Sequence, residues 1–354
     1  MKFLTAGESH GKQLTAILEG IPSNLKIDIE KINRELAKRQ EGVGRGARMS
    51  IEKDRVEITS GVRFSKTTGA PITLIIQNKD WENWESVLSV TDTGQDKTER
   101  ALTAARPGHA DLVGGIKYGH TDLRNVLERS SARETAIRVA IGAISKQLLS
   151  AIGVEFYTSV KRIGGIEGDE SAPSVQELIE ETKKEGDTLG GVIEAVVTNV
   201  PVGLGSFQQW DRKIDGLIAQ AMMSINAIKA VEFGDGVQLA LKKGSEVMDE
   251  IILDDSENLI RRTNHLGGIE GGMTNGMPII VRVTMKPIPT LMQPLQTVDV
   301  LTKQPVLASR ERSDVTAVLA ASVVVENVLA TTLAQVLLET YPSDTMEQLL
   351  ERVR

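Results

Sequence analysis

The stretch SDVTAVLAASVVVENVLATTLAQVLLET, residues 313–340, decides the architecture of this 354-residue chain. Its apolar residues occupy nearly every helical position instead of one stripe, and a helix that is apolar all round has to be buried on all sides. Ser313 or Asp314 is expected to cap its first turn. We therefore expect a long helix inside the protein, packed between two further layers.

The remaining elements follow from shorter patterns. Strands are expected where apolar residues alternate or run together between turn signals, at residues 2–8, 56–58, 72–76 and 191–200. Asp28 is expected to cap a helix that carries Ile29, Ile32 and Leu36 on one face. Further helices are expected at residues 132–152, closed by Gly153, within the acidic segment 167–188, and at 209–229 with Met222 and Met223 as core filling.

One short internal similarity is visible in the sequence. TTGAPITLII at 67–76 matches TNGMPIIVRV at 274–283, and each gives a turn, then Pro-Ile, then a strand. The match suggests two related sheet-and-helix halves around a shared helical layer, although a match this short arises by chance about as readily as by duplication. No Pro/Ser-rich linker divides the chain, so one α+β domain over residues 1–354 is expected.

Composition excludes several classes of protein. The net charge of -7 opposes binding to nucleic acid, whose phosphates attract basic surfaces. Without cysteine there is no disulfide framework, no thiolate zinc site and no thiol nucleophile, and no metal site is expected. The N-terminus lacks the apolar run of a signal peptide, and the uncharged stretch Val315–Val325 is too short to span a bilayer. We therefore expect a cytoplasmic protein with no membrane partner.

His10 lies in GESHG, residues 7–11. Histidine transfers protons near neutral pH, and flanking glycines leave room for a ligand. Glu8 and Ser9 precede it and offer partners to orient the ring. The alternative, a loop histidine hydrogen-bonded to backbone, stays open at this point.

His109 lies in RPGHAD, residues 106–111, where a turn holds it next to Arg106 and Asp111. A neighbouring arginine favours the neutral ring unless an anion lies between them, and a bound phosphate would keep the ring protonated and ready to donate to a leaving oxygen. A loop histidine satisfied by Asp111 is the open alternative. His120 and His265 have no arginine beside them and are interpreted as turn or surface residues.

The run RQEGVGRGAR at 39–48 carries Arg39, Arg45 and Arg48 and no lysine, which suits bidentate recognition of oxyanions. A solvated basic loop is the alternative. Polar groups near glycines or helix ends recur in five more segments, which together indicate a large composite pocket: 127–135, 226–227, 267–272, 286–290 and 310–314. These features point to an enzyme acting on a phosphorylated, carboxylated small molecule.

Together and in this order, the segments resemble the chorismate synthase family over essentially the whole chain. The motifs that carry the resemblance are GESHG (7–11), RQEGVGRGAR (39–48), RPGHAD (106–111), RNVLERSSARET (124–135), MMSINAIKAVEFGDG (222–236), GGIEGGMTNGMPI (267–279), KPIPT (286–290) and ERSD (311–314). The resemblance implies a β-α-β sandwich that assembles as a homotetramer. It also implies elimination of phosphate from 5-enolpyruvylshikimate-3-phosphate to give chorismate, with reduced FMN required although no net redox change occurs.

The resemblance also implies roles for individual residues. His10 would poise the reduced flavin, His109 would protonate the departing phosphate, and Asp314, with flavin N5, would serve in removal of the C6 proton. Arg39, Arg45, Arg48 and Arg133 would bind substrate anions, or NADPH in members that reduce their own flavin. The implied flavin contacts are Arg129, Ser130, Ser131, Asn226, Ala227, Gly271, Lys286, Pro287, Ile288, Pro289, Thr290 and Arg312.

Two other functions fit parts of the sequence. A flavin reductase using NADPH would explain Arg39, Arg45 and a composite flavin pocket. A non-catalytic protein that binds anions or RNA would explain the arginine–glycine run, but the acidic net charge and scarce aromatic residues oppose it. At this point the source of the electrons that reduce the flavin stays open.

Overall fold

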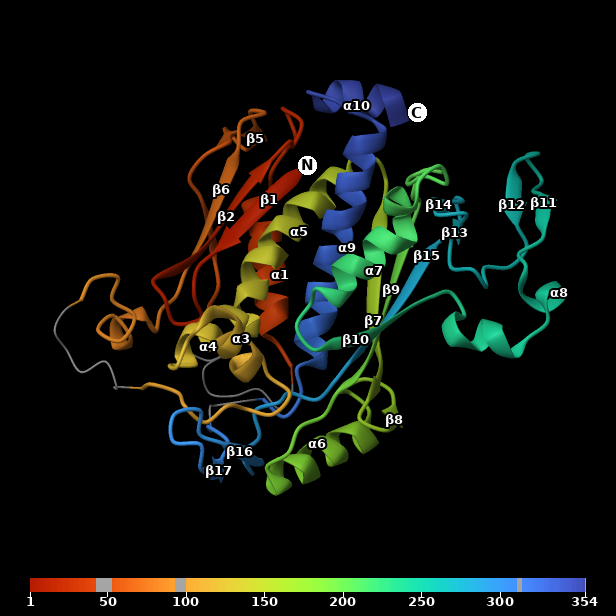
Figure 1. Cartoon of the computed structure of the whole chain (residues 1–354). Coiled ribbons are helices and arrows are strands. Elements are labelled where there is room, and N and C mark those ends of the chain that lie inside the picture. Colours follow the sequence, from red (N-terminus) through yellow and green to blue (C-terminus); the bar gives the residue numbers. More distant parts are fainter. Residues whose placement is uncertain (43–52, 93–99, 311–313, 354) are drawn as a thin grey trace.

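Two antiparallel sheets lie on either side of a layer of helices in the computed structural model of the chain (Figure 1). The structure describes residues 1–42, 53–92, 100–310 and 314–353, so Arg45, Arg48, Arg312 and Ser313 lie outside the described residues. The strand order is β1-β2-β6-β3 in the first sheet and β10-β15-β9-β7-β8 in the second. The expected α+β sandwich with a buried helical layer is confirmed.

The strands of the two sheets are short. The first sheet contains β1 (Lys2–Ala6), β2 (Gln13–Glu19), β3 (Val56–Ile58) and β6 (Ile72–Gln77). The second contains β7 (Glu155–Ile163), β8 (Ile166–Glu167), β9 (Gly191–Thr198), β10 (Ile228–Phe233) and β15 (Ile279–Met285). Two-stranded ribbons pair β4 (Val62–Arg63) with β5 (Lys66–Thr67), β11 (Ile251–Leu253) with β12 (Leu259–Arg261), β13 (Ile269–Glu270) with β14 (Met273–Thr274), and β16 (Gln296–Val298) with β17 (Pro305–Leu307).

The central layer is made by α1 (Ile29–Gln40), α5 (Thr135–Ser150), α7 (Ile214–Met223) and α9 (Val318–Thr340). Shorter or peripheral helices are α3 (Asp111–Tyr118), α4 (Arg124–Ser130), α6 (Pro173–Glu185), α8 (Gly244–Val247) and α10 (Met346–Val353). The 3₁₀ helices are η1 (Trp81–Asn83), η2 (Ala132–Glu134), η3 (Trp210–Arg212) and η4 (Gly236–Leu241). As expected, Asp28 caps α1 by accepting from the backbone N–H groups of Glu30 and Lys31.

Helix α9 is the buried helix expected from the sequence. It begins at Val318, later than expected, with Ala317 at its N-cap position and no side-chain cap, so the cap expected at Ser313 or Asp314 was wrong. By length and composition α9 is apolar enough to cross a membrane, but 83% of its most apolar window is buried inside the protein. Neighbouring protein therefore covers most of the apolar surface of α9.

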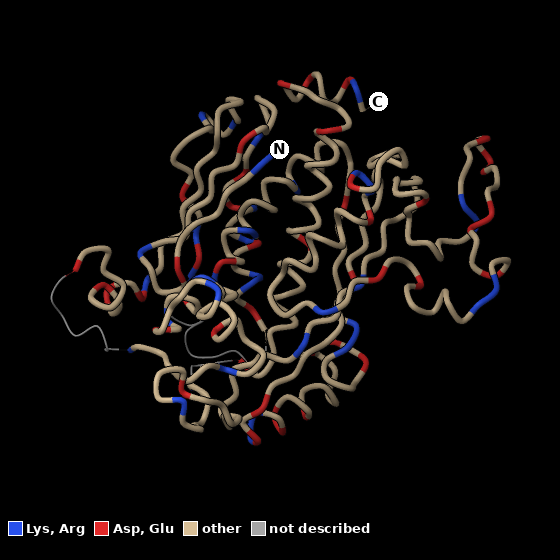
Figure 2. Tube along the Cα trace, viewed as in Figure 1, with Lys and Arg blue, Asp and Glu red and all other residues tan. Residues whose placement is uncertain are grey.

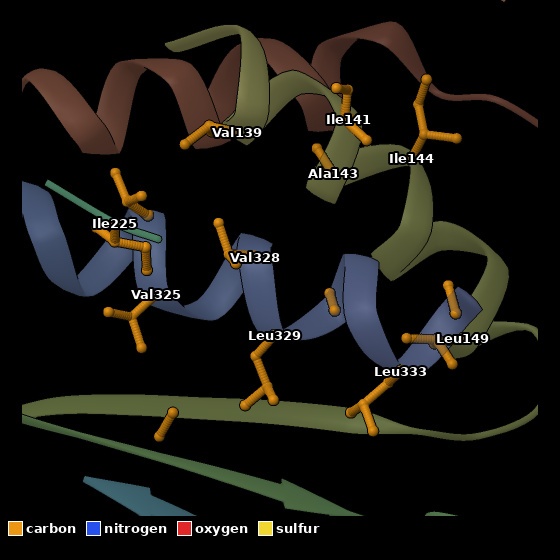
Figure 3. Close-up of a cluster of buried hydrophobic side chains, with 14 of the residues drawn as sticks. Val139, Ile141, Ala143, Ile144, Leu149, Ile225, Val325, Val328, Leu329 and Leu333 are labelled. Atoms are coloured by element: carbon orange, nitrogen blue, oxygen red, sulfur yellow. The ribbon is translucent and has the colours of Figure 1, made fainter. Parts of the chain in front are cut away.

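Gly142 lets α5 approach α9 closely. A Cβ atom on Gly142 would lie 2.3 Å from the backbone oxygen of Asn327 on α9, closer than real atoms come. Around this contact, aliphatic side chains of the two helices fill the centre of the protein, among them Val139 of α5 and Val325 and Leu329 of α9 (Figure 3). Because aromatic residues are scarce, close backbone approach and aliphatic packing together fill the core.

The similarity between segments 67–76 and 274–283 corresponds to a repeat in the structure. Thr67 Oγ1 donates to the carbonyl of Pro22 at 2.6 Å, and Thr274 Oγ1 donates to the carbonyl of Pro201 at 2.6 Å. Each threonine oxygen also accepts, at 2.9 Å, from the N–H of the leucine three residues after that proline. Strand β2 leads to α1 and β6 to α5, just as β9 leads to α7 and β15 to α9. The two halves are therefore built alike.

Some expectations about local structure were wrong. The helix expected at 209–229 shrinks to α7, because residues 228–233 form β10 and pair with β15. Helix α7 already ends at Met223, and Ala227, with a left-handed φ of +68°, lies in the turn between α7 and β10. Met222 is fully buried as expected, whereas Met223 is 47% exposed and Ile29 is 42% exposed.

The repeat brings corresponding loops to one end of the helical layer. The turn after β1 and the residue after β6 meet there, since Asn78 Nδ2 donates to the carbonyls of Glu8 and Gly11. In the second half, the backbone N–H of Lys286, just after β15, donates to the carbonyl of Ala227. Most candidate residues collect at this end of the molecule, near α3 and α4 in Figure 1.

Replacing Gly142 with Ala tests the close packing of α5 and α9. The added methyl group meets backbone, so we expect Gly142→Ala to lower the free energy of unfolding by about 1–3 kcal/mol, the usual cost of overpacking. Gly216→Ala on α7 is the control, because a Cβ there meets nothing within 4 Å. That change should be neutral or stabilising. Urea unfolding of both variants measures the difference, and equal midpoints would contradict the packing argument.

Candidate active site

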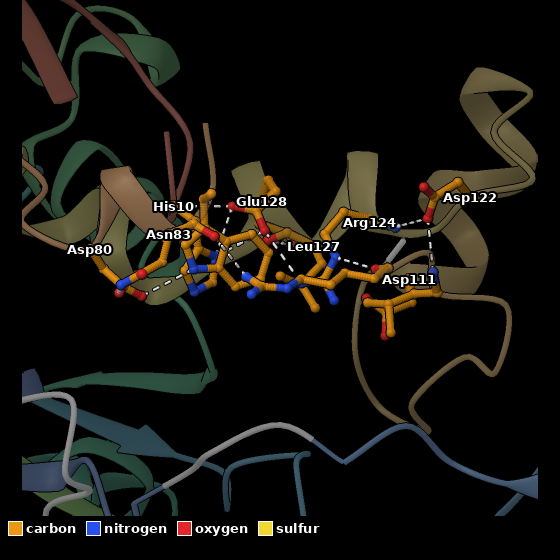
Figure 4. A network of polar contacts seen from close by, with 12 residues as sticks. His10, Asp80, Asn83, Asp111, Asp122, Arg124, Leu127 and Glu128 are labelled. Carbon is orange, nitrogen blue, oxygen red and sulfur yellow. Dashed lines mark hydrogen bonds and ion pairs between the residues drawn. The ribbon is translucent and has the colours of Figure 1, made fainter. Parts of the chain in front are cut away.

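His10 is held by a buried carboxylate from a distant segment. The backbone N–H of His10 donates to Glu128 Oε2 at 2.8 Å, and its ring Nδ1 lies 2.9 Å from Glu128 Oε1, on a residue 118 positions away in α4 (Figure 4). An ionised carboxylate only accepts hydrogen bonds, so Nδ1 carries the proton in this pair. Burial alone would raise the pKa of Glu128, but the hydrogen bonds from His10 and the charge of Arg124 lower it below its ordinary value. Glu128 therefore orients the imidazole of His10.

A second buried network holds the turn that carries His10. Arg133 donates through Nε to Asn78 Oδ1 at 2.9 Å, and Asn78 in turn binds the carbonyl groups of Glu8 and Gly11 on either side of His10. Arg133 Nη1 also contacts both carboxylate oxygens of Asp54, at 2.8 and 2.7 Å. The position of His10 thus depends on residues from several separate loops.

His109 sits in a compact cluster formed by its own loop. Its Nδ1 lies 2.6 Å from Asp111 Oδ1, while Arg106 Nη2 lies 3.1 Å from Nδ1 and 3.3 Å from Nε2 of the same ring. Arg106 also donates to Asp111, with Nε at 2.8 Å and Nη2 at 3.1 Å. Burial alone would raise the pKa of Asp111, but hydrogen bonds from His109 and Arg106 hold it well below its ordinary value. The neighbours expected for His109 are confirmed.

The segment 286–290 lies against the His109 loop. Arg106 Nη1 donates to Thr290 Oγ1 at 2.9 Å, and a Cβ on Gly108 would lie 3.9 Å from Lys286 Nζ. Burial, and then the charge of Lys229, lower the pKa of Lys286. Arg106, His109 and Lys286 therefore gather donor groups beside one loop, an arrangement suited to stabilising negative charge on a leaving oxygen.

Asn226 and Ala227 connect this region to α4. Asn226 Nδ2 donates to the carbonyl of Ser130 at 3.0 Å, and the Lys286 N–H binds the carbonyl of Ala227 at 2.9 Å. The buried Asn226 Oδ1 has no hydrogen-bond partner among the described residues. A buried acceptor without a partner is costly, and either a water molecule or a donor group of a ligand can satisfy it. Contacts thus run from α4, which holds His10, through Asn226 to Lys286.

Charged residues of both signs occur at this end of the molecule. Around α3 and α4, Lys and Arg are interspersed with Asp and Glu (Figure 2). Within the described ranges, no group of three or more His, Asp or Glu side chains is placed to hold a metal ion. The groups gathered here are guanidinium, ammonium and imidazole donors, together with the buried carboxylates of Asp54, Asp111 and Glu128 that hold them.

Comparison with known proteins gives a consistent result. A family model described as chorismate synthase matches residues 1–338. The chain is 57% identical to a chorismate synthase of Enterococcus faecalis (strain ATCC 700802 / V583), over 100% of this chain and 98% of the relative. The chain belongs to the chorismate synthase family.

Two further similarities agree with this family. A chorismate synthase of Streptococcus uberis (strain ATCC BAA-854 / 0140J) is 56% identical over 99% of this chain and 96% of the relative. A crystal structure of chorismate synthase is similar with a TM-score of 0.78 at 45% identity, covering 99% of this chain and 95% of that chain. The similarity extends through both halves of the repeat.

As expected, Arg39 lies in the last turn of α1, at the end of the helix that points to the candidate site of this chorismate synthase family member. Its Nε donates to Thr135 Oγ1 at 3.0 Å and its Nη2 to the Ala132 carbonyl at 3.0 Å. Its Nη1 lies 3.8 Å from Asp54, the carboxylate that Arg133 also contacts. Arg39 and Arg133 are therefore held side by side at the start of α5 by a shared buried acid.

Three other candidates lie near the ends of helices. Arg129 donates to the side chain and carbonyl of Thr5 and to the carbonyl of Gly7, so it holds the end of β1 beside the His10 turn. Ser131 Oγ caps η2. Asp314 is half-buried in the segment that leads into α9.

Within one chain, Gly271 lies apart from the other candidate residues. It lies in the turn between β13 and β14, with a φ of +60°. In Figure 1 this ribbon lies at the far end of β15 from Lys286. Of the other two histidines, His120 is exposed, and His265 contacts Asp235 at 2.8 Å on a peripheral loop, so both are turn or surface residues as expected.

Sequence reasoning missed several residues that build the site. We expected Glu8 or Ser9 to orient His10, but the contacts that the structure gives to the ring Nδ1 are with Glu128, which lies in RNVLERSSARET and had no assigned role. Asn78 and Asp54 were not singled out. Trp84 lies in a mostly polar segment and was not singled out, yet it is only 9% exposed. An aromatic residue in a mostly polar stretch was the one available signal.

Acid unfolding tests the buried Asp111 cluster. Because folding lowers the pKa of Asp111 from 3.8, its charged form stabilises the protein above that pH, and this stabilisation is lost as the pH falls further. We expect Asp111→Asn to be less stable than the unmodified protein at about pH 5, with the difference shrinking below about pH 4. Urea titrations at several pH values measure it. A difference that persists unchanged down to about pH 2.5 would contradict the charge argument.

Proposed function

We propose that this protein is a lyase of the shikimate pathway that converts 5-enolpyruvylshikimate-3-phosphate into chorismate. The reaction is an anti-1,4-elimination, in which phosphate leaves and a proton is lost from C6. The observation that carries the proposal is the pair of imidazoles at one end of the fold, each oriented by a buried carboxylate. Membership of the chorismate synthase family supports the proposal.

His109 is the proton donor to the departing phosphate in this proposal. Asp111 accepts from Nδ1 and holds the ring, so Nε2 is the nitrogen that serves the substrate. Arg106 and Lys286 place positive charge beside the same loop, where negative charge develops on the phosphate oxygen. Removal of the C6 proton is assigned to Asp314.

The residues around Asn226 fit a bound flavin. The unsatisfied Asn226 Oδ1 would accept a hydrogen bond from a donor group of the flavin, and Lys286, whose backbone N–H binds the Ala227 carbonyl, would supply a partly buried cation. When bound, reduced FMN supplies electron density for breaking the C–O bond and is not consumed. His10, fixed by Glu128, would hold the proton that poises the reduced flavin. The remaining flavin contacts in the proposal are Arg129, Ser130, Ser131, Ala227, Pro287, Ile288, Pro289, Thr290 and Arg312. Gly271, which the resemblance also implies, lies at the far end of β15 from Lys286 within one chain.

Arg39, Arg45, Arg48 and Arg133 bind the anionic groups of the substrate in this proposal. The shared contact of Arg39 and Arg133 with Asp54 fixes their positions and leaves the three side chains with a net positive charge. Self-reduction of the flavin by NADPH would use Arg39 and Arg45 as contacts. We further propose one domain over residues 1–354, a cytoplasmic location and assembly as a homotetramer.

Phosphate release under anaerobic conditions tests the proposed function. The protein is mixed with 5-enolpyruvylshikimate-3-phosphate and either oxidised or chemically reduced FMN, and inorganic phosphate is measured over time. We expect release only with reduced FMN. Release with neither form would overturn the proposal. NADPH oxidation measured in the absence of substrate shows separately whether the protein reduces its own flavin.

Replacing His109 tests its assigned role. His109→Ala should lower turnover by about 10²-fold or more, because loss of a positioned general acid has that effect. His120→Ala is the matched control, since His120 is exposed and belongs to the neighbouring turn. Turnover of His120→Ala should stay within about twofold of the unmodified protein, as for most surface substitutions. Equal turnover in the two variants would remove His109 from the mechanism.

A further inference from the structure

The indole of Trp84 lies directly against the ring of His10. The two ring centroids are 3.9 Å apart and the ring planes are inclined by 23°, which is a stacked arrangement. Trp84 follows η1, in a segment made mostly of polar and exposed residues. A tryptophan from a surface segment is thus buried against a candidate catalytic residue.

Other polar groups fix the indole in place. Its Nε1–H donates to Asp80 Oδ2 at 3.0 Å, and its backbone N–H donates to the Trp81 carbonyl at 2.8 Å. The guanidinium carbons of Arg100 and Arg124 lie 4.3 and 5.1 Å from the ring centroid. Figure 4 shows Asp80, His10 and Arg124 in this network. The cations over the aromatic ring and the Asp80 bond leave the indole little freedom to move.

Filling the protein core does not explain Trp84. The main hydrophobic cluster, which runs through both sheets and the helical layer, does not include it. The indole stacks on a histidine, donates to an aspartate and lies under two arginines. A large apolar ring packed on titratable and charged groups points to a role in setting the geometry of those groups.

We propose that Trp84 is a positioning residue that fixes the plane of the His10 imidazole for the reaction. The proposal rests on the proposed function, in which His10 exchanges a proton near the bound flavin. Glu128 holds one edge of the ring, at Nδ1, and a contact at one edge leaves a ring able to tilt about that contact. The stack on Trp84 removes this tilt. Both contacts bear on where Nε2 lies.

The expected loss of kcat follows from how strongly the rate of proton transfer depends on the position of the His10 ring. A misplacement of about 1 Å can lower a rate by up to about 10²-fold, and a tilt of a ring that keeps its Glu128 contact is a smaller error. We therefore expect Trp84→Leu to lower kcat by about tenfold while the KM for 5-enolpyruvylshikimate-3-phosphate stays within about twofold. Trp84→Phe keeps an aromatic face and should restore most of kcat. Trp81→Leu, at the start of the same 3₁₀ helix, is the matched control and should leave kcat unchanged.

A double-mutant cycle with His10→Ala tests whether Trp84 acts through His10. Phosphate release with reduced FMN is measured for each single variant and for the pair. If Trp84 acts through His10, Trp84→Leu causes no further loss of kcat in the His10→Ala background. If it only stabilises the fold, the loss persists there and the two effects multiply, which overturns the proposal. Should Trp84→Leu fail to fold, Trp84→Met carries the same comparison.

The outcomes separate this inference from the proposed function. Unchanged kcat in His10→Ala would remove His10 from the proposed mechanism and overturn the inference with it. A large loss in His10→Ala with full activity in Trp84→Leu overturns the inference alone. The His10 ring protons give an independent readout by NMR, because stacking on an indole shifts them upfield. They should move downfield in Trp84→Leu and much less in Trp84→Phe, and no movement would contradict the stack.

Discussion

The contact between Gly142 of α5 and the backbone at Asn327 of α9 sets the spacing on which the rest of the protein depends. Helix α5 packs on β2 and β6 of the first sheet and α9 packs on β7 and β9 of the second, so the distance between the two helices fixes the distance between the two sheets. Lys146 of α5 strengthens the same layer, because it pairs with Glu35 of α1 and with Glu326 of α9. The loops that leave these elements at one end are therefore held at fixed separations, and those loops carry the candidate active site.

The two histidines of the site are held by the same kind of contact. Each of its two imidazoles contacts a buried carboxylate, and each carboxylate also contacts an arginine: Glu128 with Arg124, and Asp111 with Arg106. An unpaired carboxylate would be expensive to bury, so the arginine and the imidazole together make the burial possible. The arrangement fixes the tautomer and orientation of each ring before any ligand arrives, and Trp84 adds a constraint on the plane of His10.

Local patterns predicted the parts of this protein that depend on near neighbours. The cap at Asp28, the buried character of α9 and the cluster around His109 all involve residues within a few positions of one another. The partner of His10 was missed because Glu128 lies 118 residues away in the sequence. The hydrogen bonds from Asn78 to the carbonyls of Glu8 and Gly11 were missed because they depend on the pairing of β2 with β6. The helix expected at 209–229 failed for a related reason, since residues 228–233 pair with the distant strand β15 and the helix ends at Met223.

The central claim is that His10 and His109 face one shared ligand site. The chain contains four histidines, so protein labelled with ¹³C at histidine gives a spectrum in which each ring can be assigned by substitution. Reduced FMN and 5-enolpyruvylshikimate-3-phosphate are added together under anaerobic conditions. We expect the signals of His10 and His109 to shift while those of His120 and His265 stay in place. Shifts confined to only one of the first pair, or to neither, would contradict the account.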